Sequence, residues 1–293
     1  MIPRKQFRLK LPSQTLVLGE RTLIMGVLNV TPDSFSDGGK YDQPRAAIEH
    51  ALAMEQAGAD ILDVGGESTR PGSEVTSPSE ELNRILPVLE GLRGQLKIPI
   101  SVDTRRSTIA EPAICAGAQL INDVSGLKSD PRIAEVAAKH GVSLILMHMR
   151  GEPRTMQKKP FAHDAMKDVT QGLRDSVAKA RKAGVLKSQI VLDPGIGFGK
   201  SHPQNYELLQ KLPQLAALGY PLLVGTSRKG FLGAAPARDG KPAPPHERIW
   251  GTAATVTASI LGGAHIVRVH DVAEMVRVAR VADRIANPRL RVR

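Results

Sequence analysis

The sequence is poor in cysteine and in aromatic residues. It has one cysteine, Cys115, among 293 residues, and Phe, Trp and Tyr together make up 3%. A lone cysteine cannot form a disulfide within the chain, and nothing in the spacing of thiols indicates a zinc site. We expect Cys115 to be a small buried residue of a helix. The core must be built from Val, Ile, Leu, Ala and Met, and branched aliphatic residues are typical of a buried parallel sheet.

Long apolar runs are also missing. No stretch approaches the roughly 20 apolar residues of a membrane helix, and the basic start MIPRKQFRLK is not followed by the apolar segment of a signal peptide. We therefore predict a cytoplasmic protein with no membrane partner.

Positive charge is in excess, with 40 Lys and Arg against 29 Asp and Glu and a formal net charge of +11. The basic residues are scattered, with small clusters only at the two ends, and no basic stripe interleaved with aromatic residues is present. We interpret the charge as a surface that attracts anionic small molecules, and we predict no nucleic-acid partner.

Short apolar segments alternate with amphipathic ones along the chain. The strand-like segments are 22–30, 60–66, 98–104, 119–126, 142–149, 189–195, 220–227 and 265–271. The helix-like segments are 44–59, 77–94, 107–117, 130–141, 163–183, 203–218, 247–262 and 272–286. Alternation of this kind predicts a parallel sheet, and eight repeats predict a closed (β/α)₈ TIM barrel of class α/β.

The ends of the chain complete this prediction of one domain, residues 1–293. We expect residues 1–21 to form an N-terminal extension with a short β-hairpin that plugs the bottom of the barrel, and residues 22–287 to form the barrel. The main alternative is an open doubly wound sheet, but no clear glycine-rich first turn of the dinucleotide type is present.

Polar side chains gather where the predicted strands end, which is where such barrels place their active sites. The list is Asn29, Asp103, Asn122, Asp123, His148, Asp193, Ser227, Arg228, Lys229, Arg268, His270 and Asp271, with Glu67–Arg70 after the second strand. Any one of these is commonly a helix cap or a satisfied buried group. It is their convergence that favours a site.

The residue types indicate what this site binds. Two carboxylates and an amide, from Asp103, Asn122 and Asp193, suit a flat heterocycle with several N–H donors, and a carboxylate pair could also serve acid–base chemistry. Lysine, arginine and histidine suit phosphate oxygens. The oxygen of Asn29 could help to hold Mg²⁺ or could anchor the following loop.

Two features resemble functional motifs without matching them. The run from Gly195 to Ser201 has three residues between Gly195 and Gly199, where a Walker loop needs four. Its glycines are expected to let the backbone approach a ligand closely. His148 lies at the end of an apolar strand, where a satisfied core histidine is the more common case.

Seven motifs resemble those of the dihydropteroate synthase family, over about Leu23 to Asn287. They are GVLNVTPDSFSDGG (26–39), DVGGESTRPG (63–72), SVDT (101–104), INDVSG (121–126), LDPGIGFGK (192–200), TSRKGFLG (226–233) and RVHD (268–271). The resemblance implies a transferase that joins 6-hydroxymethyl-7,8-dihydropterin diphosphate to 4-aminobenzoate and releases diphosphate, in a homodimer that uses Mg²⁺.

The resemblance also implies residue roles. Pterin binding is assigned to Asp103, Asn122, Asp193, Lys229 and Arg268. The 4-aminobenzoate pocket is assigned to Phe35, Thr69, Pro71, Phe198 and Lys229. Diphosphate binding is assigned to Asn29, Arg70, Arg268 and His270, and Mg²⁺ coordination to Asn29. The residues implied in catalysis are Asp103, Lys229, Arg268, Thr69 and Arg70.

One position departs from the family, because Gly230 stands where serine is frequent, which removes a hydroxyl from the aminobenzoate pocket. Other functions stay open from the residues alone. They are a pterin-dependent methyltransferase barrel, a Schiff-base aldolase that uses Lys229, a basic nucleic-acid or scaffold protein, and an inactive paralogue.

Overall fold

Eight parallel strands form the centre of the molecule. The computed structural model describes residues 4–31, 39–67, 76–152, 156, 162–235 and 241–290. The strands are β3 (Leu23–Asn29), β4 (Ile61–Gly65), β5 (Ile100–Asp103), β6 (Leu120–Asp123), β7 (Ser143–Met147), β8 (Ile190–Asp193), β9 (Leu223–Val224) and β10 (Ile266–Val269). Their order is β8-β7-β6-β5-β4-β3-β10-β9, and a parallel bridge between Leu192 and Leu222 joins β8 to the β9 edge. The sheet thus closes into the predicted (β/α)₈ barrel.

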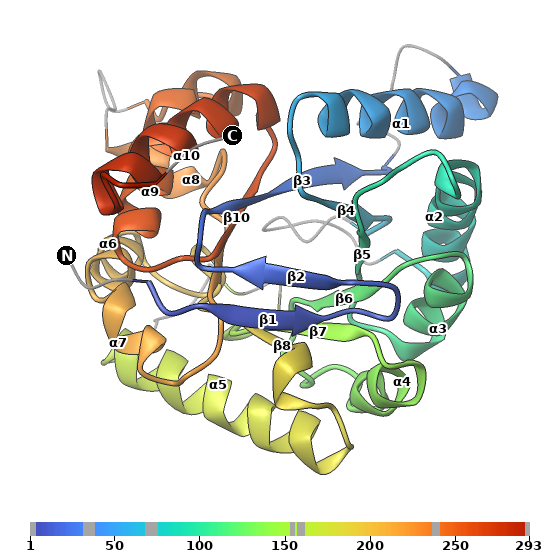
Figure 1. Ribbon diagram of the computed structural model, residues 1–293, viewed down its shortest axis with the longest axis horizontal. Helices are drawn as coiled ribbons and strands as arrows, with labels where there is room; N and C mark the ends of the chain where they lie inside the picture. Colours follow the sequence, from blue (N-terminus) through green and yellow to red (C-terminus); the bar gives the residue numbers. More distant parts are fainter. Residues whose placement is uncertain are drawn as a thin grey trace.

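Helices surround this barrel (Figure 1). They are α1 (Gly39–Gln56), α2 (Pro78–Leu92), α3 (Ser107–Cys115), α4 (Arg132–His140), α5 (Ala165–Lys182), α6 (His202–Gln210), α7 (Leu212–Ala216), α8 (Gly230–Ala234), α9 (Ile249–Leu261) and α10 (Val272–Ala286), with the 3₁₀ turns η2 (Lys187–Gln189) and η3 (Pro245–Arg248). Local signals set several boundaries. The Ser77 hydroxyl accepts a hydrogen bond from the Glu80 amide at the start of α2, and Gly141 adopts a left-handed conformation after α4.

A small antiparallel hairpin covers one end of the barrel. It consists of β1 (Phe7–Lys10) and β2 (Thr15–Leu18), and it crosses the end that faces the viewer in Figure 1. Its Leu9 and Leu18 are buried against the first inward residues of the barrel strands, such as Ile61, Leu120 and Ile266. This end is the amino-terminal end of the strands, so the hairpin is the predicted plug and the opposite end is free to form a site.

Some predicted boundaries differ from the structure. The helix predicted at 203–218 is two helices, α6 and α7, with a break at Lys211 ahead of Pro213. The short helix α8 was not predicted. Cys115 is exposed rather than buried. It lies in the last turn of α3, whose buried face is formed by Ile109, Ala110 and Ala113, and position 115 falls outside that stripe.

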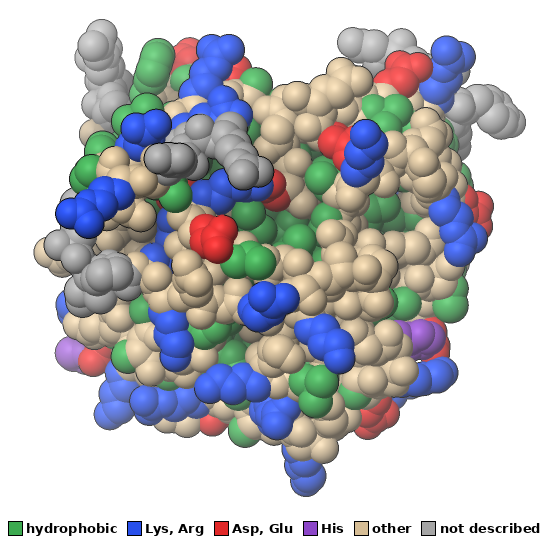
Figure 2. Space-filling model, in the orientation of Figure 1, with side chains coloured by type: hydrophobic (Ala, Val, Ile, Leu, Met, Phe, Trp, Pro, Cys, Tyr) green, Lys and Arg blue, Asp and Glu red, His purple; other side chains and the backbone are tan. Residues whose placement is uncertain are grey.

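No helix in the described ranges is long and apolar enough to cross a membrane. Lys and Arg side chains are spread over the face shown in Figure 2 among tan and green atoms, and they form no continuous stripe there. The net charge is therefore dispersed over this face.

Candidate active site at the mouth of the barrel

The strand register carries a layer of polar side chains into the barrel above the apolar layer that meets the hairpin. Ile61, Leu120, Val191 and Ile266 belong to the apolar cluster. Side chains alternate along a strand with a period of two, so the residues two positions later also face inward. These are Asp63, Asn122, Asp193 and Arg268, and Asp103 follows Ser101 in the same way.

Arg268 connects two carboxylates at the centre of this layer. Its Nε donates to Asp63 Oδ2 at 2.6 Å, and its second terminal nitrogen donates to Asp103 Oδ2 at 2.6 Å. Asn122 Nδ2 donates to the same Asp63 oxygen at 3.0 Å. Four strands carry these groups, and the closed sheet brings their side chains into one hydrogen-bonded cluster.

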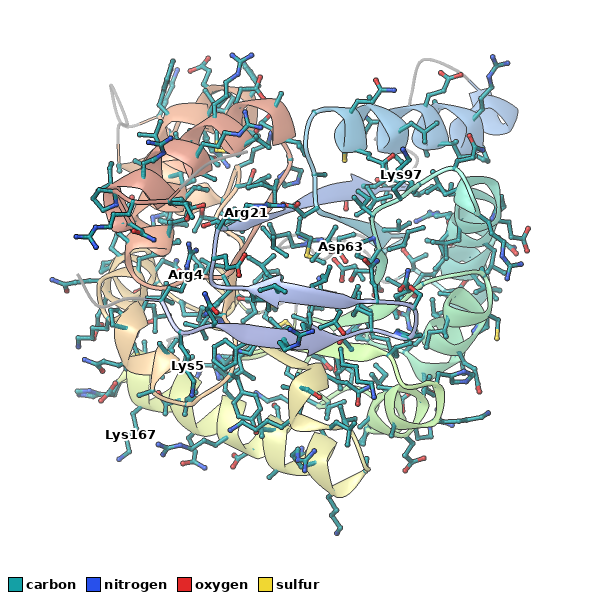
Figure 3. The ribbon with its side chains drawn as sticks, in the orientation of Figure 1. Arg4, Lys5, Arg21, Asp63, Lys97 and Lys167 are labelled. Atoms are coloured by element: carbon teal, nitrogen blue, oxygen red, sulfur yellow. The ribbon has the colours of Figure 1, made fainter. Side chains whose placement is uncertain are left out.

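Asp63 is a member of this cluster that our sequence-based site list missed. Its side chain is fully buried, and Figure 3 places it inside the barrel behind the hairpin. The signal was present in the sequence, since a carboxylate on the inward face of a buried apolar strand is costly unless it is paired. Our list followed the ends of the strands, and Asp63 lies two residues before the end of β4.

Two buried carboxylate oxygens of the cluster remain without a partner. Among the described residues, Asp63 Oδ1 and Asp103 Oδ1 accept no hydrogen bond. Buried acceptors are nearly always satisfied in proteins. These oxygens therefore suit a bound molecule that presents N–H groups.

A glycine-rich segment, Pro194–Gly199, positions the polar groups on the other side of the lumen. Its Gly195 amide donates to Asp193 Oδ1 at 2.7 Å, and the carbonyl of Ile196 accepts from Lys229 Nζ. The Lys229 ammonium also lies 4.6 Å from the centre of the Phe198 ring, a cation–π distance. Lys229 precedes α8 and is set by a tight turn in which its amide donates to the Thr226 carbonyl.

Two of the three glycines of this segment pack closely against protein backbone, and the third packs against a side chain. Gly195, Gly197 and Gly199 all have positive φ. A Cβ at Gly195 would lie 1.9 Å from the His148 carbonyl oxygen, and one at Gly199 would lie 2.1 Å from the Arg150 carbonyl oxygen. At Gly197 it would lie 3.0 Å from Cδ of Lys229. Only glycine fits these positions.

Burial and charge shift the acidities of the site in a consistent way. Burial raises the pKa of Asp103 to about 7, against the opposing effect of Arg268. Burial also raises the pKa of Asp193, with Lys229 as the main opposing charge. Burial lowers the pKa of Lys229 to about 8, and Asp193 opposes this shift. Perturbed groups that face one lumen are typical of a functional site.

The structure describes some of the other predicted residues at the rim. Asn29 ends β3 and is half-buried, and Phe198 is half-buried in the glycine-rich segment. His270 follows β10, and its Nδ1 lies 3.0 Å from the Ser227 hydroxyl. Phe35, Thr69, Arg70 and Pro71 lie outside the described residues, so their predicted roles stay predictions. At Gly230 a Cβ would meet open space.

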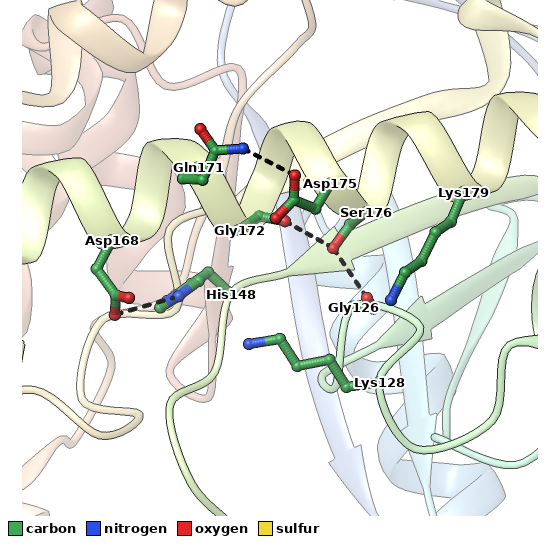
Figure 4. Close-up of a pocket in the computed structure, with 9 residues that line it drawn as sticks. All are labelled: Gly126, Lys128, His148, Asp168, Gln171, Gly172, Asp175, Ser176 and Lys179. Atoms are coloured by element: carbon green, nitrogen blue, oxygen red, sulfur yellow. Dashed lines mark hydrogen bonds and ion pairs between the residues drawn. The ribbon is translucent and has the colours of Figure 1, made fainter.

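Two small pockets lie on the outer side of the barrel wall. One, of about 230 Å³, lies between α5 and the loops after β6 and β7 and is lined by Lys128, His148 and Asp168 among others (Figure 4). Burial lowers the pKa of His148 to about 2, so this residue is a neutral buried histidine. The other pocket, of about 360 Å³, is lined mainly by Arg105, Arg106 and Arg132. Neither pocket is lined by a residue of the carboxylate cluster.

Comparison with known proteins gives a consistent match. The family described as pterin binding enzymes matches residues 25–270. A dihydropteroate synthase of Synechocystis is 51% identical over 265 residues, which cover 90% of this chain and 90% of that protein. A Xanthomonas albilineans dihydropteroate synthase solved with 4-aminobenzoic acid has a TM-score of 0.89 at 40% identity, covering 97% of this chain and 99% of that one. The same organism's enzyme solved with 7,8-dihydropteroate has a TM-score of 0.85 at 38% identity, covering 96% and 99%.

Proposed function

This chain belongs to the pterin-binding enzyme family, and from the dihydropteroate synthases among its relatives we propose which of its residues perform each part of the reaction. The enzyme is a transferase. It joins 6-hydroxymethyl-7,8-dihydropterin diphosphate to 4-aminobenzoate and gives 7,8-dihydropteroate and diphosphate, a step of folate biosynthesis. The observation that supports the assignment of roles is the buried cluster in which Arg268 bridges Asp63 and Asp103.

The pterin ring is assigned to the lumen. Asp103, Asn122 and Asp193 offer oxygen acceptors to the ring N–H and amino groups, and the two partnerless carboxylate oxygens at Asp63 and Asp103 support this. Lys229 provides a donor on the side of Asp193. The guanidinium plane of Arg268 is available for stacking on the ring. We add Asp63 to this set because it holds both Arg268 and Asn122.

The aminobenzoate is assigned to the rim beside Phe198 and Lys229. Their cation–π contact places an aromatic face and a positive charge together, which suits a benzoate ring with a carboxylate. Phe35, Thr69 and Pro71 are assigned to the same pocket from the family resemblance. Gly230 supplies no hydroxyl there, so the carboxylate is assigned to Lys229 and backbone donors.

The diphosphate is assigned to the opposite rim, at Asn29, Arg268 and His270, together with Arg70. No group of three or more His, Cys, Asp or Glu in the described ranges could hold a metal by itself. Mg²⁺ keeps several waters and binds through few protein oxygens plus phosphate. Asn29, with its amide oxygen at the end of β3, would hold it. A bound Mg²⁺ would neutralise charge on the diphosphate.

The chemistry then needs positioning and charge more than a strong base. The aminobenzoate nitrogen attacks the pterin methylene carbon while the bond from that carbon to the diphosphate oxygen breaks, and the diphosphate leaves with the electron pair. The new amine loses one proton to solvent. Arg268 and Arg70 stabilise the charge that grows on the leaving group. Thr69, Asp103 and Lys229 hold the two substrates in line.

The lumen favours positive charge at the methylene carbon. Three carboxyl groups (Asp63, Asp103 and Asp193) face two cations (Arg268 and Lys229), so ionisation of Asp103, whose pKa is about 7, leaves one negative charge in excess. An anionic surrounding lowers the energy of a cationic methylene in the transition state. Exclusion of water would keep that carbon from being hydrolysed.

A coupling assay tests the reaction. Purified protein is mixed with pterin diphosphate, 4-aminobenzoate and Mg²⁺, and each component is left out in turn. Dihydropteroate and diphosphate should form in equal amounts only in the complete mixture. Absence of product from the complete mixture, with folded protein, would contradict the assignment.

Asp193→Asn tests the pterin site. The carboxylate of Asp193 accepts hydrogen bonds from N–H groups of the pterin ring, whereas the amide of asparagine would turn an N–H group of its own toward them. Pterin affinity should therefore fall by roughly 10-fold or more. Calorimetric titration with the pterin substrate measures this. Asp175→Asn is the control, because Asp175 accepts a surface hydrogen bond from Gln171 on α5. Equal affinities of the two variants would remove Asp193 from the site.

We also propose that the enzyme is a cytoplasmic homodimer that pairs through α9 and α10. These packed helices carry three exposed apolar side chains, Trp250, Val281 and Ile285, with exposed fractions of 81%, 62% and 47%. Val281 and Ile285 are four residues apart on one face of α10, and exposed apolar side chains that share a face are typical of an interface. A single cysteine fits a reducing compartment, where disulfides are rare.

Val281→Glu tests the interface. A charge at the centre of an apolar interface should shift the sedimentation of the protein from dimer to monomer. Leu186→Glu is the matched control, since Leu186 is 46% exposed but lies before η2, away from both helices. A wild-type protein that sediments as a monomer at micromolar concentration would contradict the homodimer.

A further inference from the structure

Lys200 is a buried lysine that the proposed reaction does not use. It is 3% exposed, and burial lowers its pKa well below the usual range, while Asp193 opposes that shift. Its ammonium donates to three backbone carbonyls, those of His148 at 2.8 Å, Pro194 at 2.9 Å and Gly195 at 2.8 Å. An ammonium has three protons, so these contacts use all of them.

These three carbonyls belong to two different parts of the barrel. Pro194 and Gly195 begin the glycine-rich segment Pro194–Gly199, whereas His148 follows β7. Burying an ammonium costs several kcal/mol unless its hydrogen bonds are good. The contacts of Lys200 therefore fasten the segment to the end of the neighbouring strand, and a neutral side chain would leave carbonyls without donors.

A second attachment holds the middle of the segment from its other side. The Gly197 amide donates to Asn205 Oδ1 at 2.6 Å, and Asn205 Nδ2 donates to the Ser201 carbonyl at 2.9 Å. Asn205 itself is buried in α6. The three glycines of the segment have positive φ. Lys200 and Asn205 together hold the segment in this backbone conformation.

This conformation fixes three residues of the proposed site. The Ile196 carbonyl accepts from Lys229 Nζ, and the Phe198 ring lies beside the same ammonium. At the start of the segment the Gly195 amide donates to Asp193. A displacement of the segment would therefore move Lys229, Phe198 and Asp193 relative to the rest of the lumen.

We propose that Lys200 is a positioning residue for the reaction, whose ammonium fixes the Pro194–Gly199 segment against β7 and so aligns Lys229 and Asp193 with the two substrates. This inference rests on the proposed roles of those two residues. It assigns to Lys200 no contact with substrate.

Lys200→Met tests the proposal, because it keeps the length of the side chain and removes the ammonium. Steady-state constants are measured for both substrates well below the unfolding temperature. We expect kcat/KM to fall by about 100-fold, the effect of misplacing a reacting group by about 1 Å, with a raised KM for 4-aminobenzoate. The alkaline limb of the pH profile, set by Lys229, should move to higher pH because that ammonium becomes better solvated and loses the repulsion of the Lys200 ammonium.

Two further variants make the result decisive. Lys128→Met is the matched control, since Lys128 also donates to a backbone carbonyl after β7, that of Met149, but does not contact the segment. It should leave both KM values and the pH profile unchanged. If Lys200→Met fails to fold, Lys200→Gln replaces it, and we expect an intermediate loss because its amide has two protons.

A purely structural role gives a different outcome. Lys200→Met would then lower the unfolding temperature but keep the wild-type KM for 4-aminobenzoate, which would overturn the proposal. Lys229→Met separates this result from a failure of the proposed function. If Lys229→Met keeps the wild-type KM for 4-aminobenzoate, the assigned role of Lys229 is wrong. If it raises that KM and Lys200→Met does not, only the inference about Lys200 fails.

Discussion

Asp103 shows at the scale of one residue how burial and pairing compete. Its carboxyl group lies in the lumen with one oxygen bonded to Arg268 and the other without a partner in the described residues. Burial is the largest influence on its pKa and exceeds the opposing effect of Arg268, so the value rises to about 7. The free protein therefore holds an acid that changes its charge near neutral pH.

This acid makes the stability of the protein depend on pH. Because the folded-state pKa lies above the usual 3.8, the favourable contribution of Asp103 is fully present below about pH 4 and is lost as the pH rises through 7. The free energy of unfolding should fall across this window. Urea unfolding at a series of pH values measures it, and Asp103→Asn should remove that part of the dependence. Identical slopes for wild type and variant would contradict this prediction.

At the scale of elements, the hairpin β1–β2 closes the amino-terminal end of the barrel. Its buried leucines complete the apolar layer formed by the first inward residue of each strand. The polar layer above it then faces apolar side chains on one side and the mouth of the barrel on the other.

Leu9→Ala tests the contribution of the hairpin. Leu9 is 1% exposed, and removal of a buried leucine side chain costs about 3 kcal/mol through lost burial and the cavity left behind. Unfolding in urea gives the difference. Val17→Ala on the other strand of the hairpin is the control, because Val17 is 39% exposed and should cost less than about 0.5 kcal/mol. Equal losses would show that the hairpin is not packed as described.

At the scale of the whole molecule, the two ends of the chain are tied together. Arg4 donates to Asp283 Oδ1 at 2.6 Å and to the Ala264 carbonyl at 2.7 Å, and Asp283 also accepts from the Thr22 amide at 2.7 Å. Asp283 belongs to α10, the last helix, whereas Thr22 precedes β3, the first strand of the barrel. These bonds connect the start of the barrel to its end.

Asp283→Ala should weaken the whole fold. It leaves the buried Thr22 amide without an acceptor and the Arg4 guanidinium without its carboxylate partner, at a cost of about 3 kcal/mol. Thermal and urea unfolding measure the loss. Glu49→Ala is the control, since the Arg45–Glu49 pair is 81% and 65% exposed and should contribute less than about 0.5 kcal/mol. If Asp283→Ala lowers the free energy of unfolding no more than this control does, the hydrogen bonds of Asp283 do not stabilise the fold as described.

The sequence by itself determined the architecture and most of the described site. Alternation of apolar strands and amphipathic helices indicates a parallel sheet, and its eightfold repetition indicates a closed barrel. The carboxyl ends of the strands then meet at one end of the barrel. Asp103, Asn122, Asp193, Lys229 and Arg268 could be found for that reason. Ser77 and Gly141 set helix ends through bonds within a few residues, which is also local information.

Only the tertiary structure decided how those side chains pair. Arg268 is 205 residues away from Asp63 in the sequence and 165 residues away from Asp103, yet it binds both. No local sequence pattern encodes which carboxylates share a guanidinium. The His148 carbonyl that accepts from Lys200, and the His148 and Arg150 carbonyls that lie against Gly195 and Gly199, are likewise partners from a segment far away in the sequence. Such contacts depend on the stagger of the closed sheet and on close packing, which arise only when all strands are in place.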